Sequence, residues 1–298
     1  MATEVTSLKV SDELPSIAVA IPCFNEQAAI KTVIDQFRLA LPGAEIVVFD
    51  NNSTDGTADA AREAGARVEK VPEQGKGHVV RAAFAMLKDR GALLLVDGDG
   101  TYPAEAAPLL VAPVLSGTAD MVVGARQPEP GAGAMSPVRG LGNVLIRSAF
   151  RLLIGRGTGD LLSGYRAFSP KFLETVPLRS EGFEIETELA IEAVTRKLAT
   201  LEVSVPYRSR IAGTVSKLRA FRDGRRILKT ILWHGLRHDP ARVILAYCGI
   251  VTIVLLVPAQ LLSRFSTLGF VFELLWLVSL FGGFMALTVA AALVHIKR

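Results

Sequence analysis

Two long uncharged runs near the C-terminus constrain the fold of this 298-residue chain most strongly. Residues 243–262 and residues 274–294 carry no Asp, Glu, Lys or Arg, and extending the second run back to residue 270 adds only Glu273. As a helix, a 20-residue run spans roughly 30 Å, the thickness of a bilayer core. We expect a transmembrane hairpin, about 243–262 and 270–294, with Glu273 near the outer boundary. The alternative is a buried helical hairpin in a soluble core.

Basic residues flank both runs and predict their orientation. Five precede the first run and two follow the second: Arg225, Arg226, Lys229, Arg237, Arg242, Lys297 and Arg298. Positive flanks favour the cytoplasmic side, so we expect both termini in the cytoplasm, at the inner membrane if the source is bacterial. The first fifteen residues have mixed charges and no apolar stretch, so no secretory signal peptide is expected. Two short-linked spans without internal repeats indicate an anchor and not a transporter.

The remaining composition is that of an ordinary globular protein. Residues 1–240 carry nearly equal numbers of acidic and basic side chains, so the overall basic balance is weak evidence for nucleic-acid binding and we expect no nucleic-acid partner. Cys23 and Cys248 are far apart in the chain and suggest neither a disulfide framework nor a zinc site. This cysteine usage fits a reducing compartment.

Residues 218–240, just before the first apolar run, have an amphipathic helical pattern. One half of the helical wheel is apolar and the other carries Arg219, Arg222, Arg226, Lys229 and Arg237. A basic amphipathic helix next to a membrane span is typical of an interfacial helix at an anionic leaflet. A helix packed against the soluble domain has the same pattern, so both interpretations stay open.

Residues 17–123 alternate between strand and helix patterns. Strands are expected at 17–21, 45–49, 67–71, 92–96 and 121–123, with helices near 26–41, 57–64, 77–88 and 104–115. This order predicts an α/β fold with a mostly parallel sheet and helices on both faces. Ligands bind such sheets at the carboxyl ends of the strands.

Polar and acidic residues follow three of these expected strands. Asp97, Gly98 and Asp99 follow the apolar run LLLV, while Asp50 and Asp55 follow the second strand, and Asn25 and Glu26 follow the first. Two carboxylates one residue apart can share a divalent cation that also holds the phosphate oxygens of a nucleoside diphosphate. Read alone, Asn25 could be a helix N-cap, Asp55 a turn residue and Lys76 a solvated charge.

With these motifs the sequence resembles the inverting glycosyltransferases of family 2, which have the GT-A fold. The resemblance runs from about residue 17 to residue 226 through IPCFNE, DNNSTDGT, GKG, DGDGTYP, GAR, SGYRAF, FEIETEL and YRSRIAGTVSKL. The later motifs look like the branch that makes dolichol-phosphate or polyprenyl-phosphate sugars, including dolichyl-phosphate mannose synthase. A Q-x-x-R-W motif, expected in polymer synthases, is missing, as are the glycine-rich loops of dehydrogenases and of nucleotide-sugar pyrophosphorylases.

The resemblance implies a site for a nucleotide-sugar donor. Asp97 and Asp99 would hold Mg²⁺ or Mn²⁺, with Gly98 between them in the donor-binding loop. Lys76 would lie near the base or the diphosphate. The nucleoside pocket would be lined by Pro22, Asn25, Glu26 and Asp50.

The acceptor determines what else the site needs. A lipid phosphate is already an anion and needs cations to position it, whereas a hydroxyl needs a carboxylate base, for which Glu184 and Glu186 are the candidates. Carried over from the polyprenyl-phosphate branch, Arg126, Arg139 and Asn143 are candidates for binding the acceptor phosphate. Arg210, Ser216 and Lys217 are expected to close over the nucleotide diphosphate or the lipid phosphate.

We therefore predict an enzyme that transfers one sugar from a UDP- or GDP-linked donor to polyprenyl phosphate, with inversion. Its parts are an N-terminal extension (1–16), a GT-A domain (17–217), an amphipathic segment (218–240) and a transmembrane hairpin (241–298). Two alternatives remain: transfer to a hydroxyl of a glycolipid, and a non-catalytic membrane protein that binds nucleotide sugars. The sequence leaves open the sugar, the nucleotide, the lipid, the choice of metal and whether the protein forms a homo-oligomer.

Overall fold

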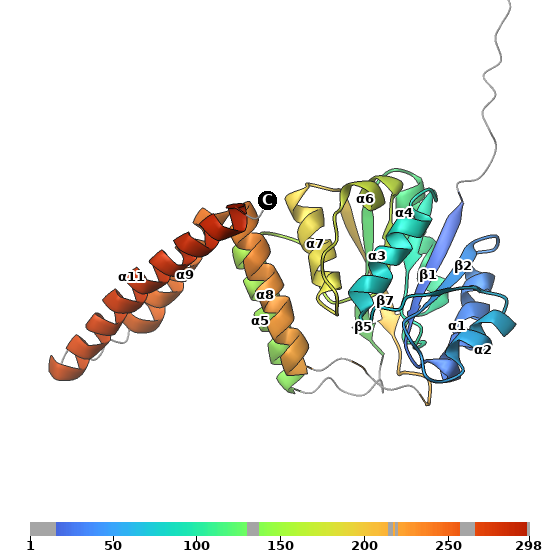
Figure 1. Ribbon diagram of the computed structural model, residues 1–298, viewed down its shortest axis with the longest axis horizontal. Coiled ribbons are helices and arrows are strands. Elements are labelled where there is room, and N and C mark those ends of the chain that lie inside the picture. The colour runs from blue at the N-terminus through green and yellow to red at the C-terminus, as the bar shows by residue number, and fades with distance from the viewer. Residues whose placement is uncertain (1–15, 130–136, 214–216, 218–219, 257–265, 297–298) are drawn as a thin grey trace, which may run out of the picture.

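The computed structural model describes residues 16–129, 137–213, 217, 220–256 and 266–296. A seven-stranded sheet lies at one end, and helices extend from it at the other (Figure 1). The N-terminal half contains β1 (Ile17–Cys23), α1 (Gln27–Ala40), β2 (Glu45–Asp50), α2 (Thr57–Glu63), β3 (Arg67–Lys70), α3 (Lys76–Leu87), β4 (Ala92–Leu95), the 3₁₀ helix η1 (Ala104–Ala106), α4 (Ala107–Leu115) and β5 (Met121–Pro128). The alternation expected from the sequence is confirmed in this half.

The C-terminal half is mainly helical. It contains α5 (Pro137–Leu153), β6 (Arg166–Phe168), α6 (Pro170–Thr175), α7 (Ile185–Thr195), β7 (Thr200–Tyr207), α8 (Ala220–His238), α9 (Pro240–Val251), the π-helix η2 (Thr252–Leu256) and α11 (Ser266–Ile296). The sequence patterns did not predict β6, β7 or α5 as elements.

The sheet has the strand order β3-β2-β1-β4-β6-β5-β7. All neighbours are parallel except β6, which is antiparallel to both β4 and β5. The chain leaves β1 toward β2 and β3 and then returns to place β4 on the other side of β1. This reversal is a topological switch point, where the loops after β1 and β4 diverge and open a crevice at the carboxyl edge of the sheet.

Helices pack on both faces of the sheet, so its central strands are buried between two apolar layers. Along β1, Val19 and Ile21 face a core shared with α1, α2 and α4. Ala18 and Ala20 face the opposite core, which α3, α6 and α7 cover. The helices on both faces that the sequence predicted are confirmed.

A third apolar cluster joins α7, which covers the sheet, to α5 and the C-terminal helix α8. Phe150 of α5, Ile191 of α7 and Ile227 and Ile231 of α8 are all buried in it. The apolar stripe of α8 is therefore largely covered by α5 and α7, as expected for a helix packed on the soluble domain. Phe221, at the start of α8, remains 86% exposed.

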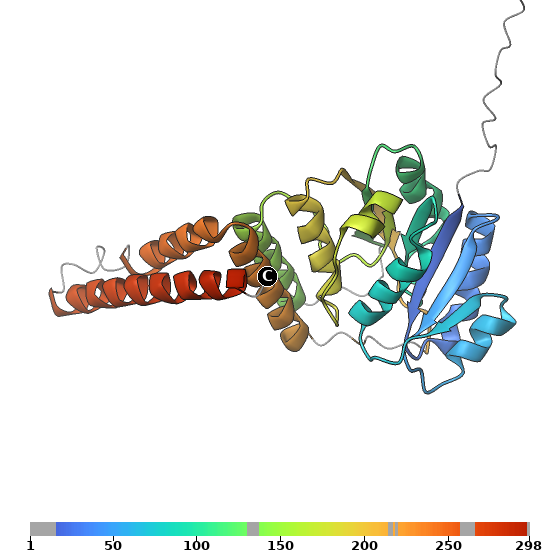
Figure 2. The ribbon, with the colours of Figure 1, turned by 45° about the horizontal axis from the view of Figure 1, so that its top comes forward.

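The last helices project away from the sheet, and α9 lies beside α11 (Figures 1 and 2). Val243 of α9 packs with Leu236 of α8 and Ala291 of α11. Among the described residues one helix is long and apolar enough to cross a membrane, with Glu273–Val294 as the candidate span. The first expected span is helical and apolar over residues 240–255, which is shorter, and residues 257–262 lie outside the described part of the chain. The two-span hairpin is thus not confirmed.

Candidate active site

The loops after β1, β2 and β4 meet at the carboxyl edge of the sheet, as the sequence predicted. The register pairs Cys23 of β1 with Asp50 of β2, and the Asn51 amide donates to the Cys23 carbonyl. The amide of Val96, after β4, donates to the Ala20 carbonyl of β1. The three polar loops therefore start from adjacent strand ends.

Lys76 joins two carboxylates from different elements. Its Nζ lies 2.5 Å from Asp97 Oδ1 and 2.6 Å from Glu186 Oε1. Its side chain is only 10% exposed, so Lys76 is not a solvated loop charge. Burial alone would lower the pKa of the Lys76 ammonium, but Asp97 and Glu186 together raise it. Burial raises the pKa of Glu186, and Lys76 opposes that effect. In this structure Glu186, a candidate base, holds the ammonium group of Lys76.

Asp99 is also held through both carboxylate oxygens. Oδ1 accepts hydrogen bonds from the amide and hydroxyl of Thr101, at 3.1 and 2.6 Å. Oδ2 lies 2.5 Å from Arg210 Nη1. The backbone amide of Ile211 donates to the Asp99 carbonyl at 3.3 Å. The segment after β7 therefore crosses the acidic loop.

The same segment reaches the loop after β1. Lys217 Nζ lies 2.9 Å from Glu26 Oε1 and donates to the Asn25 carbonyl at 3.0 Å. Burial raises the pKa of Glu26, with Lys217 opposing it. Cations from residues 210 and 217 thus lie against acidic groups from two strand ends, while Ser216 is outside the described residues.

Asn25 is not a side-chain N-cap of α1. Its backbone has φ +54°, and its Oδ1 accepts the amide of Thr54 at 2.7 Å, which ties the first loop to the second. Asp55 organises the turn: Oδ1 accepts the Thr57 amide at 3.0 Å, and Oδ2 accepts the Gln27 amide at 3.3 Å. The turn interpretation of Asp55 therefore holds.

Asn51 is a positioning residue that the sequence analysis did not single out. Its amide nitrogen donates to the carbonyls of Val71 and Glu73, and its oxygen accepts the amide of Gly75 at 2.7 Å. The buried Asp50 beside it accepts the Ser53 amide at 3.2 Å. Asn51 thus holds the loop that leads into Lys76.

Glycines bring the neighbouring backbones close to Lys76 and Asp97. A Cβ on Gly77 would lie 2.0 Å from the Ser180 carbonyl oxygen, so the start of α3 packs directly on the loop before α7. A Cβ on Gly164, in the SGYRAF motif, would lie 2.6 Å from Asp97 Oδ2 and 2.9 Å from Lys76 Nζ. The absence of a side chain at residue 164 leaves space beside the Asp97 carboxylate.

This acidic loop fits a divalent cation by its chemistry. Asp97 and Asp99 supply hard oxygen ligands of the kind Mg²⁺ and Mn²⁺ prefer, and a Cβ at Gly164 would fill the space next to Asp97 Oδ2. The Asp97 side chain is 30% exposed and the Asp99 side chain 5%. Lys76 and Arg210 provide the countercharge around them.

Arg126, expected to bind the acceptor phosphate, is already engaged by a carboxylate. Its Nε and Nη2 donate to Asp160 Oδ2 and Oδ1 at 2.7 and 2.8 Å, and its guanidinium lies over the Tyr207 ring at 5.4 Å. Burial would raise the pKa of Asp160, but hydrogen bonds from Arg126 lower it. Sequence reasoning missed Asp160, which lies 34 residues further along the chain.

The structure gives fewer contacts for the other predicted site residues. Arg139 and Asn143 lie on α5, and the side chain of Arg139 is outside the described part of the chain. Glu184 is buried and accepts the Gly182 amide at 3.1 Å. Pro22 is part of β1, and its carbonyl oxygen would lie 3.5 Å from a Cβ added at Gly98.

The sequence is similar to that of several proteins named as glycosyltransferases. Residues 18–176 match the family described as glycosyl transferase family 2. The chain is 37% identical over 209 residues to glycosyltransferase AglJ of Haloferax volcanii, covering 70% of this chain and 68% of that protein. It is 32% identical over 216 residues to a dolichyl-phosphate hexose transferase of Haloferax volcanii, covering 72% and 92%. With a polyprenol monophosphomannose synthase of Mycolicibacterium smegmatis it shares 30% over 234 residues, covering 74% and 86%.

A solved structure supports the same assignment. Glucosyl-3-phosphoglycerate synthase from Mycobacterium tuberculosis, crystallised with Mn²⁺, UDP-glucose and phosphoglyceric acid, is similar with a TM-score of 0.59 and 26% identity. The similarity covers 74% of this chain and 80% of that one. The fold is thus GT-A-like, with a mostly parallel sheet. From its sequence match, its relatives and its fold, this chain belongs to glycosyltransferase family 2 and is a glycosyltransferase.

Proposed function

We propose that this glycosyltransferase moves a single sugar from a nucleoside-diphosphate donor to a polyprenyl phosphate at the cytoplasmic face of a membrane, with inversion at the anomeric carbon. The observation that carries the proposal is the acidic loop after β4, which lies at the switch point of the sheet and is crossed by the basic segment after β7. Such a crevice, with acids on one side and cations on the other, suits a diphosphate bound together with a metal.

The donor side rests on Asp97, Asp99 and Arg210. A divalent cation held by the two aspartates would neutralise the charge that builds up on the leaving diphosphate. Arg210 and Lys217 are each paired with an acidic residue of the site, at 2.5 and 2.9 Å. We infer that both cations turn toward phosphate oxygens when the donor is bound. The Mn²⁺ and UDP-glucose in the similar solved structure support a nucleotide sugar with a metal.

The acceptor side rests on the state of the two candidate bases and on the names of two relatives. Glu186 is paired with Lys76, and Glu184 accepts a backbone amide, so both candidate bases already hold partners. An acceptor phosphate oxygen is already ionised and attacks without a base. The names of two relatives, a dolichyl-phosphate hexose transferase and a polyprenol monophosphomannose synthase, support a lipid phosphate.

A lipid acceptor would also account for the apolar helices that follow the catalytic domain. We propose that α9, η2 and the residues that follow form one span and that α11 forms the other, with both ends in the cytoplasm. The basic flanks Arg242 and Lys297 support this orientation. The anchor would hold the crevice near the lipid headgroups, where the phosphate of the acceptor lies.

The test uses the purified full-length protein in liposomes that contain polyprenyl phosphate. Radiolabelled UDP- and GDP-sugars are supplied one at a time with Mg²⁺ or Mn²⁺, and label is followed into organic solvent. We expect one donor to give labelled lipid that mild acid releases, because a sugar linked through phosphate is acid-labile. Asp99→Asn should abolish the signal, while Asp59→Asn, at an exposed position, should leave it unchanged.

Two results would reject the lipid-phosphate acceptor. Acid-stable labelled lipid would indicate transfer to a hydroxyl of a glycolipid, with a carboxylate base. Donor binding without transfer to any lipid, in protein that retains its fold, would indicate a nucleotide-sugar-binding role.

A further inference from the structure

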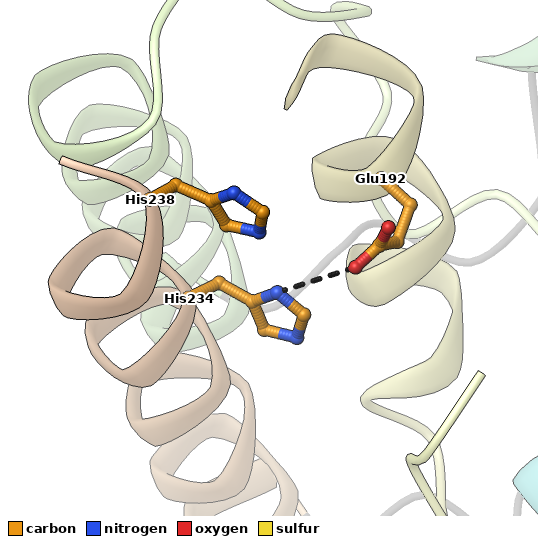
Figure 3. Close-up of side chains that lie close together, drawn as sticks. All are labelled: Glu192, His234 and His238. Carbon is orange, nitrogen blue, oxygen red and sulfur yellow. Dashed lines mark ion pairs between the residues drawn. The ribbon is translucent and has the colours of Figure 1, made fainter. Parts of the chain in front are cut away.

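A cluster of histidine and glutamate side chains lies between α7 and α8, on the side of α7 that faces away from the sheet. His234 and His238 are four residues apart on α8, so they project from one face of that helix. Glu192 faces them from α7 (Figure 3). One potential ligand atom from each side chain lies within 4.8 Å of the others. His234 and Glu192 are buried, and His238 is exposed at the edge.

The distance between His234 and Glu192 is longer than a normal hydrogen bond. His234 Nδ1 and Glu192 Oε1 are 3.5 Å apart, beyond the usual range for such a bond. His234 is 2% exposed, and its Nδ1 has no hydrogen-bond partner among the described residues. Two ligands that each lie 2.0–2.1 Å from a tetrahedral cation are roughly 3.3 Å apart. The observed spacing therefore matches two ligands of a shared cation.

The surrounding groups orient the two carboxylates that face His234. Glu192 Oε2 accepts Arg196 Nε at 2.7 Å, which leaves Oε1 directed at His234. His234 Nε2 faces Glu188 Oε1 at 3.7 Å, and Glu188 is held by the backbone amides of Arg179 and Ser180. A carboxylate behind the second nitrogen of a ligating histidine is the usual support of a metal site.

We propose that Glu192, His234 and His238 form a second metal site, which binds a zinc-class divalent cation and fastens α8 to α7. Two imidazoles and one carboxylate favour such a cation over Mg²⁺, which prefers an all-oxygen set. The site is separate from the acidic loop: Glu192 lies six residues beyond Glu186, roughly 9 Å along the helix. Its exposed His238 gives a cation access from solvent. The cysteine count does not reveal this site, because its ligands are histidine and glutamate.

Binding of a cation at this site would hold α8 against α7, and this effect does not depend on which acceptor the enzyme uses. α8 runs directly through Asp239 into α9, so a cation that joins α8 to α7 fixes the apolar helices relative to the catalytic domain. The apolar contacts of Ile191, Ile227 and Ile231 lie in the same interface. The cation adds a cross-link whose loss should loosen that interface without altering the donor site.

The experiment measures zinc in full-length protein purified in detergent without a polyhistidine tag. The protein is loaded with zinc chloride in the presence of millimolar Mg²⁺, desalted and analysed by elemental mass spectrometry. We expect about one zinc per chain. His238→Ala, an exposed substitution that should not prevent folding, and Glu192→Gln should each reduce the content to less than about a tenth of that.

Two control variants separate this site from other metal-binding groups. His78→Ala removes a histidine outside the cluster, and Asp97→Asn removes a ligand of the acidic loop; both should retain zinc. Zinc at a 100-fold excess over its dissociation constant should raise the melting temperature of the wild type by about 5 °C or more and leave His238→Ala unchanged. Wild-type protein without bound zinc, or zinc retained equally by His238→Ala, would overturn the proposal and leave a buried histidine–glutamate network.

Discussion

Replacing Lys76 with methionine removes the ammonium group that lies between the carboxylates of Asp97 and Glu186. The two Nζ–O distances are 2.5 and 2.6 Å, and the Lys76 and Glu186 side chains are 10% and 5% exposed. Methionine keeps the length of the lysine stem, so the substitution mainly removes the charge. It leaves a buried carboxylate, Glu186, without its cation.

The expected cost follows from that burial. Removing one partner of a buried ion pair typically destabilises a protein by about 3–5 kcal/mol, because the remaining charge stays desolvated. For a domain of this size each kcal/mol lowers the melting temperature by about 2–4 °C, so Lys76→Met should lower it by roughly 6–20 °C. Lys171→Met is the matched control: Lys171 pairs with Asp120 at 3.0 Å but is 64% exposed. This surface pair should contribute less than about 1 kcal/mol.

A second substitution separates charge burial from lost packing. Lys76→Met combined with Glu186→Gln removes both members of the buried pair, so we expect it to recover more than half of the lost stability. The assay is thermal unfolding of the four proteins in one detergent, at pH 7 and without metal. A Lys76→Met protein that melts within about 2 °C of wild type, or a double variant no more stable than Lys76→Met, would refute the reasoning.

Three further predictions concern the rest of the site. Asp99→Asn should lower metal-dependent transfer at least about 100-fold in the labelled-lipid assay, because the carboxylate that anchors the cation is lost; Asp59→Asn is its exposed control. Although burial raises the pKa of Asp160, hydrogen bonds from its arginine partner lower it, so its stabilisation is complete above about pH 4 and is lost as the pH falls through the folded pKa. Asp160→Asn should therefore destabilise by about 1.5–3 kcal/mol at pH 7, measured by denaturant unfolding, and the difference should shrink below about pH 4. Gly164→Ala should impair metal-dependent transfer because its Cβ would lie 2.6 Å from a carboxylate oxygen, whereas Gly140→Ala, on open helix surface, should not.

The N-terminal half of the fold was predictable because its signals are local. Apolar runs such as LLLV, each followed by a polar loop, mark parallel strands and the edge where their loops meet. The three-residue strand β6 carries too short a pattern to be recognised, and its antiparallel pairing depends on β4 and β5. α5 was missed as well, although its sequence is amphipathic, because no strand alternation frames it.

Partners distant in sequence explain most of what sequence reasoning missed in the site. Asp97, Asp99 and Lys76 were proposed as site residues from motifs and spacing, whereas the contact of Lys76 with Glu186 is set by the packing of α3 on α7. Arg126, on β5, was proposed to bind the acceptor phosphate, and the carboxylate that holds it in the structure lies in the loop between α5 and β6. No periodicity in the sequence indicates which charges meet across the fold.

Helix α7 shows how the two ends of the molecule are connected. Glu186, Glu188 and Glu192 are all buried on this 11-residue helix, and three buried carboxylates are costly unless each has a partner. Their partners belong to different parts of the structure. Glu186 pairs with Lys76 beside the acidic loop, Glu188 accepts backbone amides before α7, and Glu192 faces His234 of α8 and pairs with Arg196. An apolar helix would pack without specifying these partners. The glutamates therefore make the position of α7 depend both on Lys76, which is paired with the acidic loop, and on α8, so the crevice and the apolar helices keep a defined relation.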